Sequence, residues 1–343
     1  MSNTEDNNGQ QLGGSGEMTS SKRECTSCEQ NNIDNITEGI DSVAILDMST
    51  CASCGKEGNN EDMNICNRCK MVKYCNAACK KKHRTKHKKK CDRRVAELYD
   101  EQLFKEVEPG ECPICMIPIL QISQAQFWAC CGKGICHGCI YSMMESEGGG
   151  ELCPYCRTPP SKSNREEIKR LNKLMNNGNG EAFNTLGIAY SKEALGLSRD
   201  YSKANELYLK GGELGCSTAY FNLGNNYRDG SGVEVDEKMA KHYHELATIG
   251  GSVHARHNLA CIEWNVGNYD RGMRHFLLAA RAGYELSLDS VKVGFKCGLI
   301  TKDEYANTLR AYQKIHDEMK SDAREKVVES CTSTYDLPQG SNR

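Results

Sequence analysis

The sequence predicts small zinc-stabilised α+β modules followed by an all-α repeat solenoid. Two observations lead to this prediction. Fifteen of the 21 cysteines lie between Cys51 and Cys156, nearly all in closely spaced pairs. After that stretch a pattern of Ala, Leu, Gly and Tyr recurs at offsets of 37 and 36 residues. A close cysteine pair supplies half of a tetrahedral zinc site, and a repeat of this length is typical of stacked helix pairs.

Length, charge and the N-terminal sequence limit the classes of function. The 343 residues suggest two or three domains, and a net charge of −2 gives no bulk attraction to polyanions. The apolar runs are too short to cross a bilayer, so we expect no membrane association. The polar start MSNTEDNNGQ lacks the features of a secretory signal. We therefore expect the cytoplasm or the nucleus, where thiols bind metal instead of forming disulfides.

Residues 1–50 are rich in Asn, Gly, Ser, Thr and Glu and have little apolar content. Such a composition buries too little surface to offset the entropy of ordering, so we expect a disordered tail. Within it, Cys25 and Cys28 form an isolated C-x2-C pair. The pair supplies only two of the four ligands of a zinc site, and its role stays open.

The first cysteine group, residues 51–91, contains seven cysteines together with His83 and His87. The order is C-x2-C, C-x2-C, YC-x3-C and H-x3-C, which resembles the MYND-type zinc finger. In that family, the ligand pairs alternate between two metals in a cross-brace. The resemblance assigns one zinc to Cys51, Cys54, Cys75 and Cys79, and the other to Cys66, Cys69, His87 and Cys91.

His83 is the alternative imidazole ligand. The H-x3-C spacing places His87 and Cys91 one helical turn apart on the same face. This favours His87 as the ligand and leaves His83 a structural or surface role. A module of about 40 residues has too small a core to fold alone, so zinc is expected to supply most of its stability.

A basic run follows the first ligands. Lys80–Arg94 contains ten Lys or Arg residues and one Asp. Nucleic-acid binding through phosphates is one interpretation, and a solvated helix face or a surface for an acidic partner is the other. The run has no interleaved aromatic residues and no groove-entering motif. Because MYND fingers bind short, often proline-containing peptides, the resemblance favours a protein partner over nucleic acid.

Residues 92–110 are predicted as a helical linker. Val95, Leu98, Tyr99 and Leu103 recur at helical spacing, and Pro109-Gly110 stops the helix.

The second cysteine group, residues 111–158, resembles a RING-type finger. Its cross-brace would assign one zinc to Cys112, Cys115, Cys136 and Cys139, and the other to Cys130, Cys131, Cys153 and Cys156. Four zinc ions are therefore expected, two in each finger. One position departs from the pattern, because Lys133 stands where a common RING has a histidine. Adjacent ligands are geometrically tight, so the choice between Cys130 and His137 as a ligand stays open.

The RING resemblance implies a role in ubiquitin transfer. In that family the zinc loops and the central helix form an apolar groove for a ubiquitin-conjugating enzyme. Ile114, Met143 and Pro154 stand at positions of this groove. Arg157 directly follows the last ligand and matches the linchpin, where a cation donates hydrogen bonds to both the conjugating enzyme and ubiquitin. Such a ligase needs no nucleophile, because it holds the thioester in a pose ready for attack.

The remaining sequence predicts repeats between two flanking segments. Residues 159–180 form a linker with a first helix, and residues 318–343 a disordered tail. Within residues 181–317, the motif Ala182-x3-Leu186-Gly187-x2-Tyr190 recurs from Ala219 and, in part, from Ala255. It resembles the Sel-one-like repeat, a tetratricopeptide relative with two antiparallel helices per unit. A degenerate fourth unit runs from Ser287 to about Ile315.

Together these features favour a zinc-dependent ubiquitin ligase whose MYND finger and repeats bind protein partners or substrates. The first alternative is a non-catalytic adaptor whose two fingers only bind proteins. The second is a nucleic-acid-associated regulator that uses Lys80–Arg94. A MYND-bearing methyltransferase is excluded, because the second finger and the repeats occupy the rest of the chain.

Overall fold

The computed structural model describes residues 50–59, 62–106, 109–119, 124–146 and 152–333, with backbone only for residues 328–333. The predicted tail of residues 1–50 lies outside this description except for its last residue, and Cys25 and Cys28 lie outside it too. The chain divides into two compact units, Met1–Tyr99 and Asp100–Arg343. Among the helices described, none combines the length and the apolar character that a membrane span requires.

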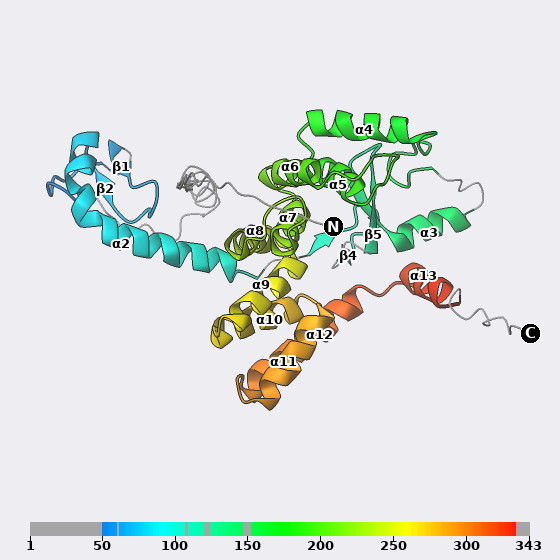
Figure 1. The fold of residues 1–343 in the computed structure, drawn as a ribbon. Coiled ribbons are helices and arrows are strands. Elements are labelled where there is room, and N and C mark those ends of the chain that lie inside the picture. The colour runs from blue at the N-terminus through cyan, green and yellow to red at the C-terminus, as the bar shows by residue number, and fades with distance from the viewer. Residues whose placement is uncertain (1–49, 60–61, 107–108, 120–123, 147–151, 334–343) are drawn as a thin grey trace, which may run out of the picture. The chain divides into compact units, whose positions relative to one another are not determined.

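The described part of the first unit is a two-stranded hairpin followed by a long helix. Strand β1 (Asn64–Ile65) pairs antiparallel with β2 (Lys73–Tyr74), and α2 (Ala77–Leu103) follows (Figure 1). The buried cluster consists of Cys51, Met63, Cys66, Cys69, Tyr74, Cys91 and Val95. Because four of these seven side chains are thiols, apolar packing contributes little to this unit.

Helix α2 is continuous across the boundary predicted at residue 92. The sequence analysis separates a finger that ends at Cys91 from a helical linker of residues 92–110. In the structure one helix runs from Ala77 to Leu103, and its last residues, from Asp100, belong to the second unit. The continuity has a simple cause, because no Gly or Pro interrupts the helix.

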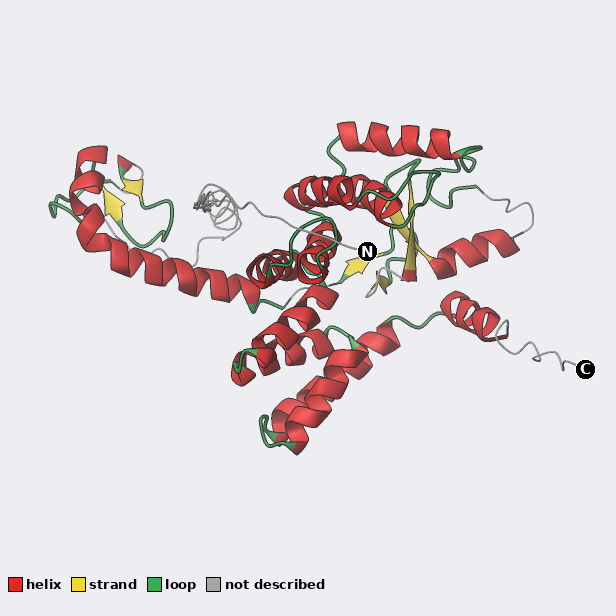
Figure 2. Ribbon diagram, viewed as in Figure 1, coloured by secondary structure: helices red, strands yellow, loops and turns green. Residues whose placement is uncertain are grey.

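The second finger, residues 111–158, opens the second unit with two hairpins and a helix. Strand β3 (Gly110–Glu111) pairs with β4 (Pro118–Ile119), and β5 (Ala125–Trp128) pairs with β6 (Lys133–Cys136). Helix α3 (His137–Glu145) follows β6 directly (Figure 2). Ile135 and Ile140 are buried with three of the cysteines at the centre of the finger.

The rest of the second unit is helical. The helices are α4 (Asn164–Asn176), α5 (Gly180–Ser191), α6 (Tyr201–Glu213), α7 (Ser217–Asp229), α8 (Glu237–Ile249), α9 (Val253–Asn265), α10 (Tyr269–Arg281), α11 (Glu285–Lys296), α12 (Lys302–Glu318) and α13 (Asp322–Ser333). From α5 to α12, each odd-numbered helix packs against the next one in the chain (Figure 1). The predicted fold class, metal-binding modules followed by a helical solenoid, is confirmed.

An aromatic ring explains the recurring glycine of the repeat motif. A Cβ atom on Gly187 would lie 2.6 Å from the ring of Tyr208, and one on Gly224 would lie 3.0 Å from the ring of His244. Tyr208 and His244 occupy equivalent positions on α6 and α8. The glycine therefore lets the paired helices approach closely.

The second finger shares a hydrophobic cluster with the first solenoid helices. Ala129, directly after β5, is buried with Leu171 of α4 and Leu186 of α5. Nδ2 of Asn179 also donates a hydrogen bond to the carbonyl oxygen of Gly132 at 3.4 Å. The segment predicted as a linker, residues 159–180, is thus packed between the finger and the repeats.

The segment predicted as a disordered tail, residues 318–343, contains the end of α12 and the helix α13, which packs against α3. Arg324 donates from Nη1 to the carbonyl oxygen of Pro118 at 2.8 Å and from Nη2 to that of Ile117 at 3.2 Å. Residues 322–333 are therefore helical in the structure, within the segment for which the sequence predicts a disordered tail. The segment is mostly polar. Hydrogen bonds from Arg324 hold it, and the sequence alone does not reveal their partners.

Arginines fasten the end of α2 within the second unit. Arg256 is only 5% exposed and donates to the carbonyl oxygens of Leu103 at 2.9 Å and Lys105 at 3.0 Å. Arg271 donates to both carboxylate oxygens of Asp100, at 2.7 and 3.1 Å. The last carbonyl groups of a helix have no hydrogen-bond donor within the helix. Here Arg256 donates to one of them, that of Leu103.

Candidate metal centres

Four groups of four ligand side chains come together in the described residues. Within each group the ligand atoms lie within 4.8 Å of one another. The groups are Cys51, Cys54, Cys75 and Cys79; Cys66, Cys69, His87 and Cys91; Cys112, Cys115, Cys136 and Cys139; and Cys130, Cys131, Cys153 and Cys156. They are the same four sets that the sequence analysis assigns.

The distances between the sulfur atoms suit a metal tetrahedron. Two sulfurs bound to one zinc at about 2.3 Å lie about 3.8 Å apart. The Sγ atoms of Cys54 and Cys75 are 3.7 Å apart, and so are those of Cys115 and Cys136. The described cysteines are all free of disulfide bonds. The chain therefore has four sites that are capable of binding zinc.

Four of the C-x2-C pairs fold through the same tight turn, namely those that begin at Cys51, Cys66, Cys112 and Cys153. The residue after the second cysteine has a positive φ: 73° at Gly55, 53° at Lys70, 58° at Met116 and 59° at Arg157. Its N–H donates to the carbonyl oxygen of the first cysteine at 2.8 to 2.9 Å. For a residue other than glycine this conformation costs about 1–2 kcal/mol. The turn thus sets the backbone position of Arg157.

Thiols this close cannot all ionise without a cation. Burial raises the pKa of Cys131, and the hydrogen bond and negative charge of Cys153 help to raise it to about 11. In the first finger, a hydrogen bond from Cys69 lowers the pKa of Cys66 to about 3, and the same contact raises the pKa of Cys69. One thiolate is thus favoured at the cost of its neighbour, and a bound divalent cation would stabilise both.

The two histidines of the first finger have different surroundings. His87 is buried, and its Nε2 lies 3.3 Å from Sγ of Cys69. His83 stacks on His87, with ring centroids 5.8 Å apart, and its Nδ1 lies 3.3 Å from the hydroxyl of Tyr74. His87 therefore belongs to the ligand group, whereas His83 supports the ring of His87.

In the second finger, the adjacent residues Cys130 and Cys131 reach the same ligand group. Sγ of Cys130 lies 3.4 Å from that of Cys156, and Sγ of Cys131 lies 3.8 Å from that of Cys153. His137 lies outside this group, at the start of α3, where it lines a cavity beside α13. Of the two alternatives for this ligand, the structure brings Cys130 to the site.

The residues predicted to contact a conjugating enzyme lie on the zinc loops and α3. Ile114 is 43% exposed in the first zinc loop, Met143 and Pro154 are half-buried, and Arg157 is exposed. The sequence analysis missed three further exposed apolar side chains in the same elements: Met116, Met144 and Tyr155. Met116 and Tyr155 stand next to ligands in the chain, which was a usable signal, because zinc ligation fixes the orientation of a short loop.

Arg324 is a further residue that the sequence analysis missed. Its Nη2 lies 3.9 Å from Sγ of Cys115, in addition to its contacts with backbone carbonyls. Such an outer donor helps to orient a metal-bound thiolate. The two residues are 209 positions apart in the chain, so no local pattern could connect them.

Comparisons with known families match two regions of the chain. The MYND finger family matches residues 51–91, and the Sel1 repeat family matches residues 186–216, 217–252 and 263–284. The chain thus contains a MYND finger and Sel1 repeats, and both predictions are confirmed. These matches do not cover the second finger. Because both families are protein-interaction modules, they support a role in binding proteins.

Solved structures include similar helical proteins. A Sel1 repeat protein from Oxalobacter formigenes has 23% sequence identity and a TM-score of 0.40, over 46% of this chain and 67% of that chain. The protective antigen c5321 of uropathogenic Escherichia coli, which has an SLR fold, has 23% identity and a TM-score of 0.40, over 47% of this chain and 35% of that chain. MamA has 18% identity and a TM-score of 0.28, over 48% and 91%.

Proposed function

We propose that the chain is a zinc-dependent ubiquitin ligase of the RING type. Its second finger would recruit a charged ubiquitin-conjugating enzyme, and its MYND finger and Sel1 repeats would bind substrates or other protein partners. The proposal places this activity in the cytoplasm or the nucleus, where the ligand thiols stay reduced.

The crossed order of the ligands in the second finger carries this proposal. The first and third cysteine pairs share one group, and the second and fourth pairs share the other. When metal is bound, this order ties the first zinc loop to the start of α3, and the second zinc loop to the turn between β5 and β6. Ile114 then stands 43% exposed on a rigid loop between two ligands. A rigid loop that displays an apolar side chain is suited to docking a protein, because little entropy is lost on binding.

Arg157 would provide the contact that promotes transfer. It is exposed, and the turn after Cys156 holds its backbone. Its guanidinium can donate to one acceptor on the conjugating enzyme and to another on ubiquitin. The substrate amine then attacks the thioester carbonyl, so that a C–N bond forms, the C–S bond breaks, and the cysteine thiol of the conjugating enzyme is released. The ligase accelerates this step by restricting the orientation of the thioester.

The test is a self-ubiquitination assay of the full chain with a panel of conjugating enzymes. We expect chain formation by the wild type with at least one enzyme, and loss of most of this activity in Ile114→Ala and Arg157→Ala. Absence of chain formation with every enzyme of the panel, both by the wild type and by the variant Arg324→Ala described below, would exclude the ligase.

A matched control separates the role of Arg157 from its place in a strained turn. Lys70 occupies the equivalent turn position in the first finger, with φ 53°, so Lys70→Ala makes a similar change away from the second finger. We expect Lys70→Ala to keep wild-type activity. Zinc content measured on each variant verifies that the ligand groups stay intact.

A second candidate function, a non-catalytic adaptor, has one observation in its favour. Helix α13 packs against α3, the helix that a conjugating enzyme would approach, and Arg324 contacts the backbone beyond the first zinc loop. Arg324→Ala would loosen this contact. If both the wild type and Arg324→Ala are inactive with the whole panel, the adaptor is the better description. If only the variant is active, α13 restrains a ligase.

A further inference from the structure

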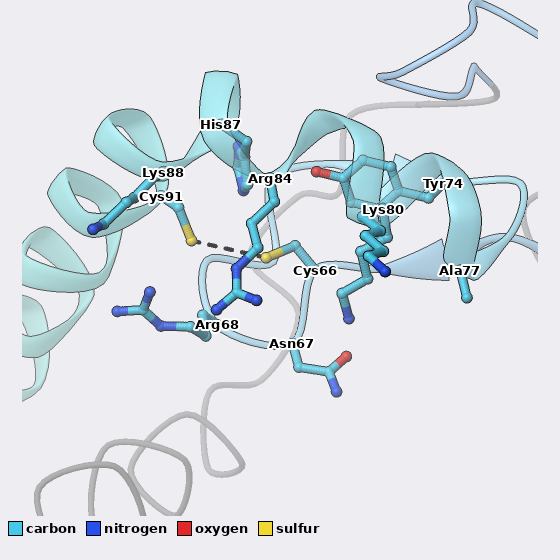
Figure 3. A pocket seen from close by; sticks show the side chains of 11 residues that line it. Cys66, Asn67, Arg68, Tyr74, Ala77, Lys80, Arg84, His87, Lys88 and Cys91 are labelled. Atoms are coloured by element: carbon cyan, nitrogen blue, oxygen red, sulfur yellow. Dashed lines mark hydrogen bonds between the residues drawn. The ribbon is translucent and has the colours of Figure 1, made fainter. Parts of the chain in front are cut away.

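The first finger contains a groove beside its second ligand group. The groove has a volume of about 520 Å³ and lies between the start of α2 and the loop that follows Cys66 (Figure 3). Lys80, Arg84 and Lys88 stand one helical turn apart on α2 and line one wall. Asn67 and Arg68 line the other wall.

The cations of this groove have few anions around them. Arg68 forms an ion pair with Asp92 at 2.9 Å. Lys80, Lys81, Arg84 and Lys88 form no ion pair with any residue in the described part of the chain. Residues 80–91 contain eight Lys or Arg and no acidic residue. Two zinc-loaded sites, one with four thiolates and one with three, would together carry about three negative charges. Positive charge therefore remains in excess.

The position of these cations is unfavourable for the isolated helix. The amino-terminal end of a helix favours anions, yet the first turn of α2 has no acidic residue. Lys80, Arg84 and Lys88 also repel one another, because like charges four residues apart destabilise a helix. An anionic ligand in the groove would relieve both effects at once.

The lining of the groove favours carboxylates of a peptide over nucleic acid. The aromatic rings in the lining belong to Tyr74, which is 1% exposed, and His87, which is 8% exposed, so neither offers a face on which a base could stack. Asn67 is exposed and provides both a donor and an acceptor for a peptide backbone. The guanidinium of Arg84 can bind a carboxylate through two parallel hydrogen bonds.

We propose that this groove binds an acidic segment of a protein partner, with Lys80, Arg84 and Lys88 contacting its Asp or Glu side chains. The proposal rests on the protein-binding role of the MYND finger and does not depend on the ligase. A failure of the ubiquitination assay would leave it standing, and its own failure would leave the ligase standing.

The experiment measures binding of fluorescent peptides to the zinc-loaded full chain by anisotropy. One peptide carries a run of glutamates, and the other has glutamine at the same positions. We expect the glutamate peptide to bind more tightly, with an affinity that falls as salt is raised. Equal binding of the two peptides would overturn the proposal, and so would tighter binding of a single-stranded oligonucleotide of the same length.

Two charge reversals locate the site. Arg84→Glu places an anion in the groove and should weaken binding of the glutamate peptide about fivefold to tenfold. Lys86→Glu makes the same change in charge on a side of α2 that does not line the groove, and should have a much smaller effect. Equal weakening by both would point to long-range attraction alone and would contradict a defined groove. Lys80→Glu, with zinc content measured, repeats the test if Arg84→Glu loses metal.

Discussion

The two fingers use similar ligands, seven cysteines and His87 in the first and eight cysteines in the second, but are stabilised differently. The buried cluster of the MYND finger is mostly thiols, with Met63, Tyr74 and Val95 as its other members. The second finger has its own small core, and in addition Ala129 is buried in a cluster with Leu171 and Leu186. Similar zinc sites therefore belong to a small separate module in the MYND finger and to a larger compact unit in the second finger.

The difference has a physical cause. A chain of about 40 residues buries too little apolar surface to be stable alone, so the MYND finger depends on its metals. The second finger lies in one compact unit with the helices α4 to α13. Its hairpin packs on α4 and α5, and its helix α3 packs on α13. Loss of metal from this finger would therefore expose surfaces that other helices need.

Removal of a metal ligand should have the largest effect on stability. The two fingers should differ most clearly in how far the damage spreads. Cys75→Ser or His87→Ala should unfold the MYND finger, because zinc contributes about 10 kcal/mol to the folding of such modules. The amide NMR signals of residues 50–91 should collapse, while the solenoid signals remain. Cys136→Ser should instead perturb signals of α4 and α5 as well. Elemental analysis of the wild type should find zinc for all four ligand groups; half that content would contradict the paired sites.

A core substitution tests whether the second finger depends on the solenoid. Leu171→Ala removes a fully buried side chain from the shared cluster and should destabilise the second unit by about 2–5 kcal/mol. It should also accelerate zinc release from the second finger to a chromogenic chelator. Leu288→Ala is the matched control, because Leu288 is buried in a separate cluster on α11. Equal zinc release from both variants would show that the finger is independent.

Acidification should weaken the solenoid through a buried histidine. Burial, aided by the positive charge of Arg228, lowers the pKa of His244 to about 4. Between pH 6.5 and 4 the unfolded chain therefore binds a proton that the folded chain does not. The contribution of His244 to the free energy of unfolding is fully present above pH 6.5 and decreases as the pH falls towards 4, by about 2 kcal/mol at pH 5.

Urea unfolding followed by circular dichroism at pH 7 and pH 5 checks this prediction. His244→Phe places a non-titrating ring at this position, as Tyr208 does in the preceding repeat. The variant should lose about 2 kcal/mol less stability than the wild type between the two pH values. The same loss in both proteins would contradict the assignment of this effect to His244.

The smallest expected effect concerns the contact of α13 with the second finger. Arg324→Ala removes hydrogen bonds to the carbonyl oxygens of Pro118 and Ile117 and should cost about 1–2 kcal/mol. Hydrogen exchange in α13 should become faster, and so should zinc release from the group that contains Cys115. Lys326→Ala, an exposed position on the same helix, is the control. If it has the same effect as Arg324→Ala, the arginine contacts do not hold α13.

Some features of the site and of the fold could be predicted from single residues, because the sequence pattern that indicates them spans only a few positions. The spacing H-x3-C favours His87 over His83, since it places two ligands on one helical turn. The glycine at position 187 marks the repeat, and Tyr208 explains it. By contrast, Arg324 and Cys115 lie 209 positions apart, so no local pattern could connect them.

The sequence by itself determined the ligand pairs and the helical repeat, because spacing along the chain imposes both locally, and the resemblance to known fingers supplied the alternation of the pairs between the metals. Only the tertiary structure decided that Cys130 rather than His137 reaches the metal group, and that the second finger shares a core with the solenoid. These outcomes depend on how surfaces distant in sequence fit together. Ala129, which follows β5, is buried because it joins a cluster with Leu171 and Leu186 of the solenoid helices.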